Sequence, residues 1–104
     1  MLVIEREDGE TRTLIKAKGA LTMHTATRLL RAADAAMKRN LPLELDLAEV
    51  DRMDTAGAAT LVEILARAKK RGFSLCVRAL SDAARKRLAI VRVLDLFSPC
   101  ASQT

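Results

Sequence analysis

Residues 43–97 alternate between strand-like and helix-like patterns, and this alternation constrains the fold more than any other feature. Residues 43–50 (LELDLAEV) alternate leucine with other side chains, as in a short strand. A helical pattern covers residues 57–71, and residues 73–79 (FSLCVRA) again have the apolar, β-branched character of a strand. Strands joined through a helix lie parallel with a right-handed crossover, so this order predicts an α/β fold.

The segments before and after this unit complete the predicted order. Residues 1–8 and 11–19 each have the pattern of a strand, and Asp8-Gly9 predicts a tight turn between them. Apolar side chains from Met23 to Met37 recur at helical spacing and predict a helix over residues 22–39. At the other end, Ser81 is expected to cap a helix that continues towards Leu94.

The length of 104 residues and a hydrophobic content of 50% indicate one domain with a single core. We expect an α/β domain at residues 1–97, with a small mixed sheet of four to five strands packed by three to four helices. Residues 95–97 are expected to be extended, and residues 98–104 to form a loose C-terminal tail. The only aromatic residues are Phe73 and Phe97, so the core must be mainly aliphatic.

The two cysteines, Cys76 and Cys100, are too few and too isolated to indicate a disulfide framework or a zinc site. We expect Cys76 to be a buried, inert thiol in a strand and Cys100 to be a free, exposed thiol. The sequence has no signal peptide and no long apolar run. It therefore predicts a cytoplasmic protein without a membrane span.

A net charge of +5 raises the question of nucleic-acid binding, because basic side chains cluster in residues 67–71 and 85–87. Single-strand binders interleave such charges with aromatic side chains, which are absent from these segments, and no known DNA-binding motif is present. The clusters are better explained as solvated faces of amphipathic helices, and no specific nucleic-acid partner is expected. The charge could still attract an acidic partner or an anionic membrane surface.

Few residues are suited to catalysis or metal binding. His24 is the only histidine, and no second imidazole or metal-spaced cluster accompanies it. Asp46, Glu49, Asp51 and Asp54 lie near one strand end and could together hold a divalent cation, although solvated acids are common in such loops. We therefore expect no catalytic residue, no metal and no cofactor.

The stretch DRMDTAGAATLVEIL (residues 51–65) places small and polar residues where a strand meets a helix. It lacks the lysine of a phosphate-binding loop and the serine of a nucleophile elbow. Asp54 or Thr55 can cap the first helical amides, and Gly57 permits another surface to approach the backbone. Together with Ala56 and Ala58, these residues predict a partner-binding site at the helix start.

Residues 43–97 resemble the STAS domain, the fold of bacterial anti-sigma-factor antagonists and of sulfate-transporter tails. The resemblance rests on a strand that contains Leu-Asp-Leu, on Asp-Thr-Ala-Gly after a gap at residues 54–57, and on the glycine-bounded strand and final helix that follow. It implies a non-enzymatic, partner-binding domain. In such antagonists, a serine at the helix start is phosphorylated by a kinase-type anti-sigma factor, the protein that the unphosphorylated form binds.

Ala56 stands where the resemblance would place that phosphoserine, so we expect constitutive binding or control by the partner; Thr55 is the only adjacent candidate for phosphorylation. The Asp-Thr-Ala-Gly form also resembles the cytosolic STAS subunit of phospholipid-trafficking ABC transporters, in which this threonine docks on the ATPase. A third alternative is a nucleotide- or lipid-sensing domain, with the helix N-terminus and Arg52 as an anion site. The sequence does not indicate an oligomeric state.

Overall fold

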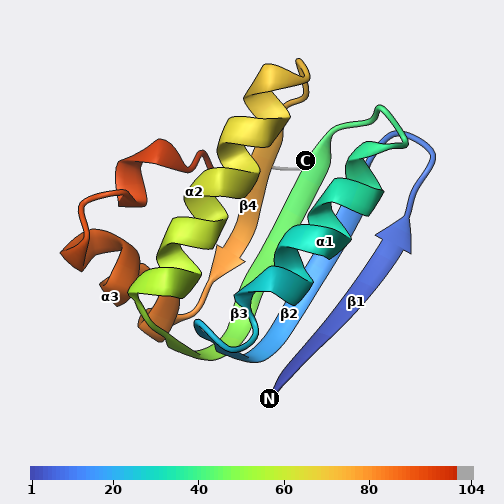
Figure 1. The fold of residues 1–104 in the computed structure, drawn as a ribbon. Coiled ribbons are helices and arrows are strands. Elements are labelled where there is room, and N and C mark those ends of the chain that lie inside the picture. The colour runs from blue at the N-terminus through green and yellow to red at the C-terminus, as the bar shows by residue number, and fades with distance from the viewer. Residues whose placement is uncertain (101–104) are drawn as a thin grey trace.

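Over the part of the chain that the structure describes, the protein is a four-stranded sheet with helices packed on one face (Figure 1). The computed structural model describes residues 1–100. The strand order is β1-β2-β3-β4, with β1 antiparallel to β2 and the other neighbours parallel. The predicted α/β class with a small mixed sheet is confirmed. In chain order the elements are β1 (Leu2–Asp8), β2 (Thr13–Leu21), α1 (Ala26–Met37), β3 (Leu43–Met53), α2 (Thr55–Lys70), β4 (Leu75–Leu80), α3 (Asp82–Ile90) and the 3₁₀ helix η1 (Leu94–Leu96).

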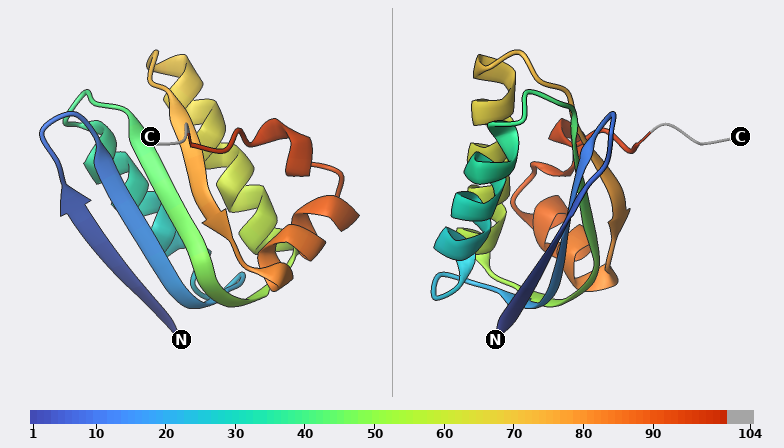
Figure 2. Two further views of the ribbon diagram at one scale, coloured as in Figure 1. Left: turned by 180° about the vertical axis from the view of Figure 1, so that it is seen from behind. Right: turned by 90° about the vertical axis from the view of Figure 1, so that its right-hand side faces the viewer.

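The core lies between the sheet and the helices. Leu43, Leu45 and Leu47 of β3 alternate toward the helices and are buried, as the period-2 pattern predicts. Leu61 and Ile64 on α2 are fully buried against them. Figure 2 shows that α1 and α2 lie on the same side of the sheet. We call the opposite side the open face.

Charged side chains occupy much of the open face. On β2, the Lys16 Nζ lies 3.7 Å from the Glu49 Oε2, and the Lys18 Nζ lies 3.5 Å from the Glu5 Oε1. On β3, Glu44 is bridged by Arg12 at 3.2 Å and by Arg78 of β4 at 3.5 Å. This alternation of sign across neighbouring strands suits a sheet face that is in contact with water.

The connection between β1 and β2 differs from the predicted Asp8-Gly9 turn, because residues 9–12 form a longer loop. The Gly9 N–H donates to the Arg12 carbonyl at 2.9 Å and closes it. Arg39, just after α1, donates to the Gly9 carbonyl at 2.7 Å and to the Thr13 hydroxyl at 2.9 Å. The loop is therefore shaped by a contact with a helix end, which a local turn signal does not contain.

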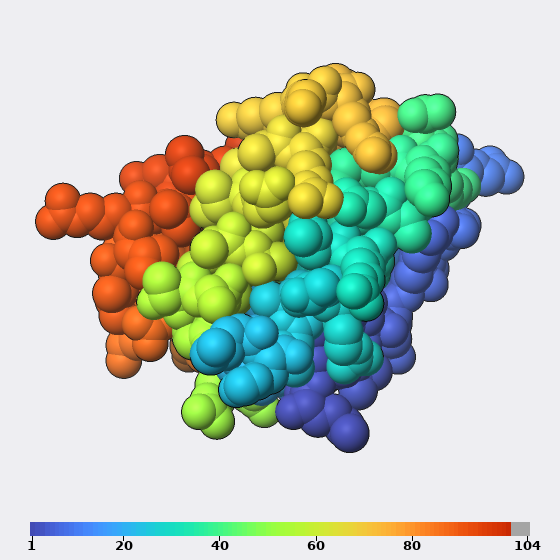
Figure 3. Space-filling model, in the orientation of Figure 1, coloured from blue at the N-terminus to red at the C-terminus, as the bar shows by residue number. Residues whose placement is uncertain are grey.

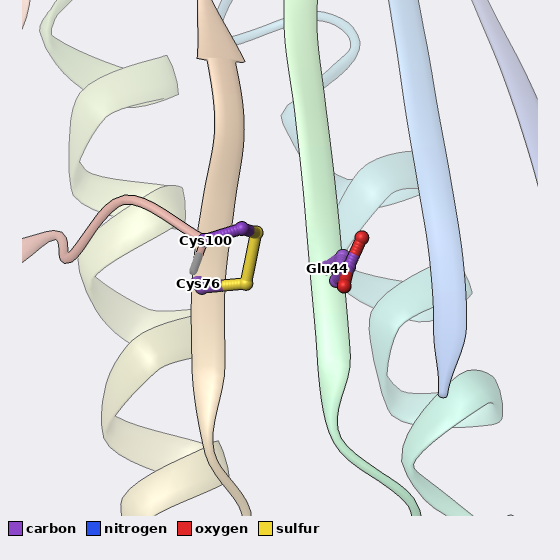
Figure 4. Close-up of side chains that lie close together, drawn as sticks. All are labelled: Glu44, Cys76 and Cys100. Carbon is purple, nitrogen blue, oxygen red and sulfur yellow. A yellow bond between two sulfur atoms is a disulfide. The ribbon is translucent and has the colours of Figure 1, made fainter. Parts of the chain in front are cut away.

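The C-terminal segment corrects the expectations for both cysteines. Cys76 and Cys100 form a disulfide bond, so neither is a free thiol (Figure 4). Leu75 and Val77 occupy the core positions of β4, which leaves Cys76 half-buried on the open face. Phe97 is buried and returns the chain to the free edge of β4.

Residues 94–96 form the helix η1, although residues 95–97 were expected to be extended. After η1, residues 98–100 run beside β4, where the Val77 N–H donates to the Ser98 carbonyl at 2.8 Å. The expected loose tail is thus anchored over this part, and residues 101–104 lie outside the described residues. No helix among residues 1–100 has the length and apolar character needed to cross a membrane.

Candidate partner-docking site

Asp54 fixes the start of α2. Its Oδ1 accepts a hydrogen bond from the Gly57 N–H at 2.8 Å, and its Oδ2 accepts one from the Met23 N–H at 3.0 Å. These backbone donors, Gly57 first and Met23 second, hold the pKa of the Asp54 carboxyl below its usual value. Asp54 therefore caps the helix and ties it to the loop between β2 and α1. This carboxylate thus already occupies the helix N-terminus, where the sequence also allowed an anion site.

Gly57 packs against the end of β2. A Cβ built on Gly57 would lie 2.3 Å from the Leu21 carbonyl oxygen, and both Gly57 and Ala58 are buried. The surface that approaches the Gly57 backbone thus belongs to the same chain. Of the five residues predicted to bind a partner, these two form the base of the site, whereas Thr55 is exposed and Ala56 is half-buried.

Thr55 is the first residue of α2, and its hydroxyl makes no side-chain hydrogen bond within residues 1–100. Asp54, and not Thr55, supplies the cap. The Thr55 side chain is exposed.

An apolar groove begins at Thr55 and runs between α2 and the chain that follows α3. Its volume is about 280 Å³. Figure 3 shows the helix-covered side of the molecule, where α2 and α3 lie next to each other. We call the apolar groove between α2 and the chain after α3 the Thr55 groove. Its lining residues are Thr55, Ala58, Ala59, Val62, Val91 and Val93. Sequence reasoning did not find the two valines, because they reach the groove through the packing of α3.

A second depression, of about 440 Å³, lies on the other side of Asp54. Met23, His24 and Arg52 line it, and Met23 is 67% exposed. The sequence placed Met23 on the buried face of a helix over residues 22–39. Instead, residues 22–25 form a turn in which the Thr25 hydroxyl donates to the Ala20 carbonyl at 2.7 Å. This turn brings Met23 and His24 to the surface near Asp54.

Within residues 1–100, the four acids near the end of β3 are not brought together as a group of potential metal ligands. Asp46 accepts from the Ala48 N–H at 3.0 Å on the open face, Glu49 faces Lys16 and Lys18, and Asp54 caps α2. Asp51 is exposed on β3.

The one group of potential metal ligands found among residues 1–100 is Glu44, Cys76 and Cys100, whose donor atoms lie within 4.8 Å of one another. The two sulfur atoms are bonded to each other, and Glu44 is paired with arginine. The group is therefore a disulfide beside a salt bridge.

Comparison with known families matches residues 5–97 to a model described as "Mlab, STAS domain". The chain belongs to the STAS family. The resemblance seen in residues 43–97 is thereby confirmed and extends to the first strand. A search of curated proteins found no significant match.

Solved structures show the same fold. An anti-sigma factor antagonist from Mycobacterium paratuberculosis has 22% identity and a TM-score of 0.78, over 98% of this chain and 87% of that chain. A putative anti-sigma factor antagonist from Thermotoga maritima has 12% identity and a TM-score of 0.80, over 95% and 86%. Unphosphorylated SpoIIAA, an anti-sigma factor antagonist, has 12% identity and a TM-score of 0.76, over 96% and 90%. The STAS domain described here thus has the anti-sigma-factor antagonist fold.

Proposed function

We propose that this STAS domain is a non-enzymatic regulatory module that docks a protein partner through Thr55 and the adjoining groove. The observation that carries the proposal is the exposed Thr55 hydroxyl, which has no side-chain hydrogen bond within the described residues and lies at one end of an apolar groove. A partner could bury its own apolar side chain in the groove and hydrogen-bond to Thr55. Such a combination of an apolar centre and a polar contact is typical of protein interfaces.

Rigidity of the base supports the same proposal. Asp54 joins the start of α2 to the loop between β2 and α1 through hydrogen bonds, and Gly57 is in tight contact with Leu21. The Thr55 side chain is therefore presented from a fixed helix start, which limits the entropy that binding would cost.

Ala56 bears on how binding is regulated. It is half-buried at the second position of α2 and has no hydroxyl to accept a phosphate. We propose that partner binding is constitutive, or is controlled by the partner's own state. The appearance of a phosphate on Thr55 in cells, seen as a shift in intact mass, would contradict this.

Two classes of partner fit the proposal. A kinase-type anti-sigma factor is supported by the likeness to solved anti-sigma factor antagonists. The ATPase subunit of a phospholipid-trafficking ABC transporter is supported by the Asp-Thr-Ala-Gly form of residues 54–57 and by the exposed position of Thr55.

The test compares three tagged proteins in pull-downs from native lysate of the source organism: wild type, Thr55→Arg and Thr11→Arg. Thr11 is a matched control, because it is also exposed but lies before β2, at the opposite end of that strand from Leu21 and α2. A partner lost only with Thr55→Arg supports docking at this surface. A kinase-like anti-sigma factor identifies the first class, and an ABC ATPase identifies the second.

Circular dichroism and thermal melting of both variants should match the wild type, because both positions are exposed. A partner that binds all three proteins equally would refute docking at Thr55.

A further inference from the structure

The free edge of β4 is covered by the C-terminal segment. β4 is the last strand in the sheet order, so only β3 pairs with it inside the sheet. On the other side, the Val77 N–H donates to the Ser98 carbonyl at 2.8 Å, and the Cys100 N–H donates to the Val77 carbonyl at 3.0 Å. The disulfide between Cys76 and Cys100 closes this contact covalently (Figure 4).

Among the contacts of residues 1–100, little else holds residues 98–100 in place. Phe97 is the last buried residue before them, and the Ser98 and Pro99 side chains are exposed. The pairing with β4 is one isolated bridge, between Val77 and Pro99. A single bridge at an exposed edge opens readily, since few buried contacts oppose the opening. The disulfide is thus the main restraint on this segment.

The disulfide is also accessible. Both cysteines are half-buried, and Cys76 lies on the open face, where no helix of residues 1–100 packs. Glu44, the register partner of Cys76 on β3, has its carboxylate within 4.8 Å of the sulfur atoms. Arg12 and Arg78 offset the charge of Glu44, which weakens the repulsion between this carboxylate and an approaching thiolate.

We infer that Cys76 and Cys100 form a reversible thiol–disulfide site that latches residues 98–100 onto the edge of β4. A dithiol reductant opens the latch in two steps. Its first thiolate attacks one sulfur and breaks the Cys76–Cys100 bond, which gives a mixed disulfide and one cysteine thiolate. Its second thiol then displaces the bound sulfur. The protein gains two electrons and two protons, and the reductant leaves as a disulfide. A low-molecular-weight disulfide, such as oxidised glutathione, reverses the reaction.

Opening the latch has a structural consequence that does not depend on the proposed partner. It frees the outer N–H and carbonyl of Val77, which leaves an unpaired strand edge able to accept another strand. The redox state of the two cysteines therefore decides whether this edge is covered.

The experiment equilibrates the full-length protein in glutathione buffers that range from oxidising to reducing. Alkylation followed by mass spectrometry gives the oxidised fraction, and NMR hydrogen exchange follows the amides of Val77 and Cys100. We expect the disulfide to form and to open within this range. On reduction, both amides should exchange at least tenfold faster. The Leu45 amide in central strand β3 should still exchange more slowly than either, because it is exposed only by global unfolding.

The variant Cys100→Ser is the control and should exchange at the fast rate in every buffer. Three results would each overturn the inference. Both thiols could remain alkylatable in the oxidising buffers; the disulfide could persist in the most reducing one; or the two amides could exchange equally in both redox states.

Discussion

Replacing Gly57 with alanine should destabilise the protein, although alanine is the better helix former. The new Cβ would lie 2.3 Å from the Leu21 carbonyl oxygen, where a C···O contact of about 3.3 Å is normal. The start of α2 must then move by about 1 Å, which strains the Asp54 cap. Overpacking of this kind costs about 1–3 kcal/mol and a lost cap costs about 1 kcal/mol. Helix propensity returns only about 0.5–1 kcal/mol, so the net loss is about 1–3 kcal/mol.

Thermal unfolding measures this loss, with an expected fall in Tm of at least about 4 °C for a domain of this size. Ala59→Gly calibrates helix propensity, because Ala59 is exposed on the same helix. If propensity alone mattered, Gly57→Ala would raise Tm about as much as Ala59→Gly lowers it. A Tm equal to or above that of the wild type would show that α2 does not pack tightly on Leu21.

Three further outcomes follow from packing, capping and the disulfide. Leu61→Ala should lower the free energy of unfolding by about 2–5 kcal/mol in urea titration, because Leu61 is fully buried; a loss below 1 kcal/mol would contradict its place in the core. Asp54→Ala should cost about 0.5–2 kcal/mol near neutral pH. The folded-state pKa of Asp54 is depressed, so its contribution is present above the usual value of 3.8 and is lost as the pH falls below it. The difference between wild type and Asp54→Ala should therefore shrink in urea titrations below about pH 3.8, and a constant difference would rule out the ionised cap. The free energy of unfolding of Cys100→Ser should be about 3–4 kcal/mol lower than that of the oxidised wild type, since the disulfide closes a loop with a sequence separation of 24. Equal stability of the two proteins without reductant would contradict a cross-link that restrains the chain.

The order of strands and helices could be predicted because the apolar residues of each strand and each helix recur with the period typical of that element. The ends of elements were harder, since they depend on neighbours. The strand expected over residues 43–50 continues to Met53, because β2 keeps pairing with it through Arg52 and Met53. The charged residues at the end of β3 are typical of a loop in the sequence, but pairing with the neighbouring strand β2 keeps them in the sheet.

The disulfide could not be predicted from spacing. Cys76 alternates with core residues, and Cys100 follows a serine and a proline, so each has a simple local explanation. Their meeting depends on Phe97, which is buried and turns the chain back beside β4. This return of the chain depends on tertiary packing. The separation of 24 residues between the two cysteines therefore does not predict that they meet.

The predicted docking residues turn out to do two different jobs. Gly57 is small because α2 starts against the end of β2, and Asp54 is acidic because two backbone amides point at it. These two would be required in any chain with this helix start, whatever it binds. Under the proposed function, Thr55 and the valines of the groove must therefore determine the choice of partner. Substituting Val93 should change affinity or partner preference, whereas substituting Gly57 should first damage the fold.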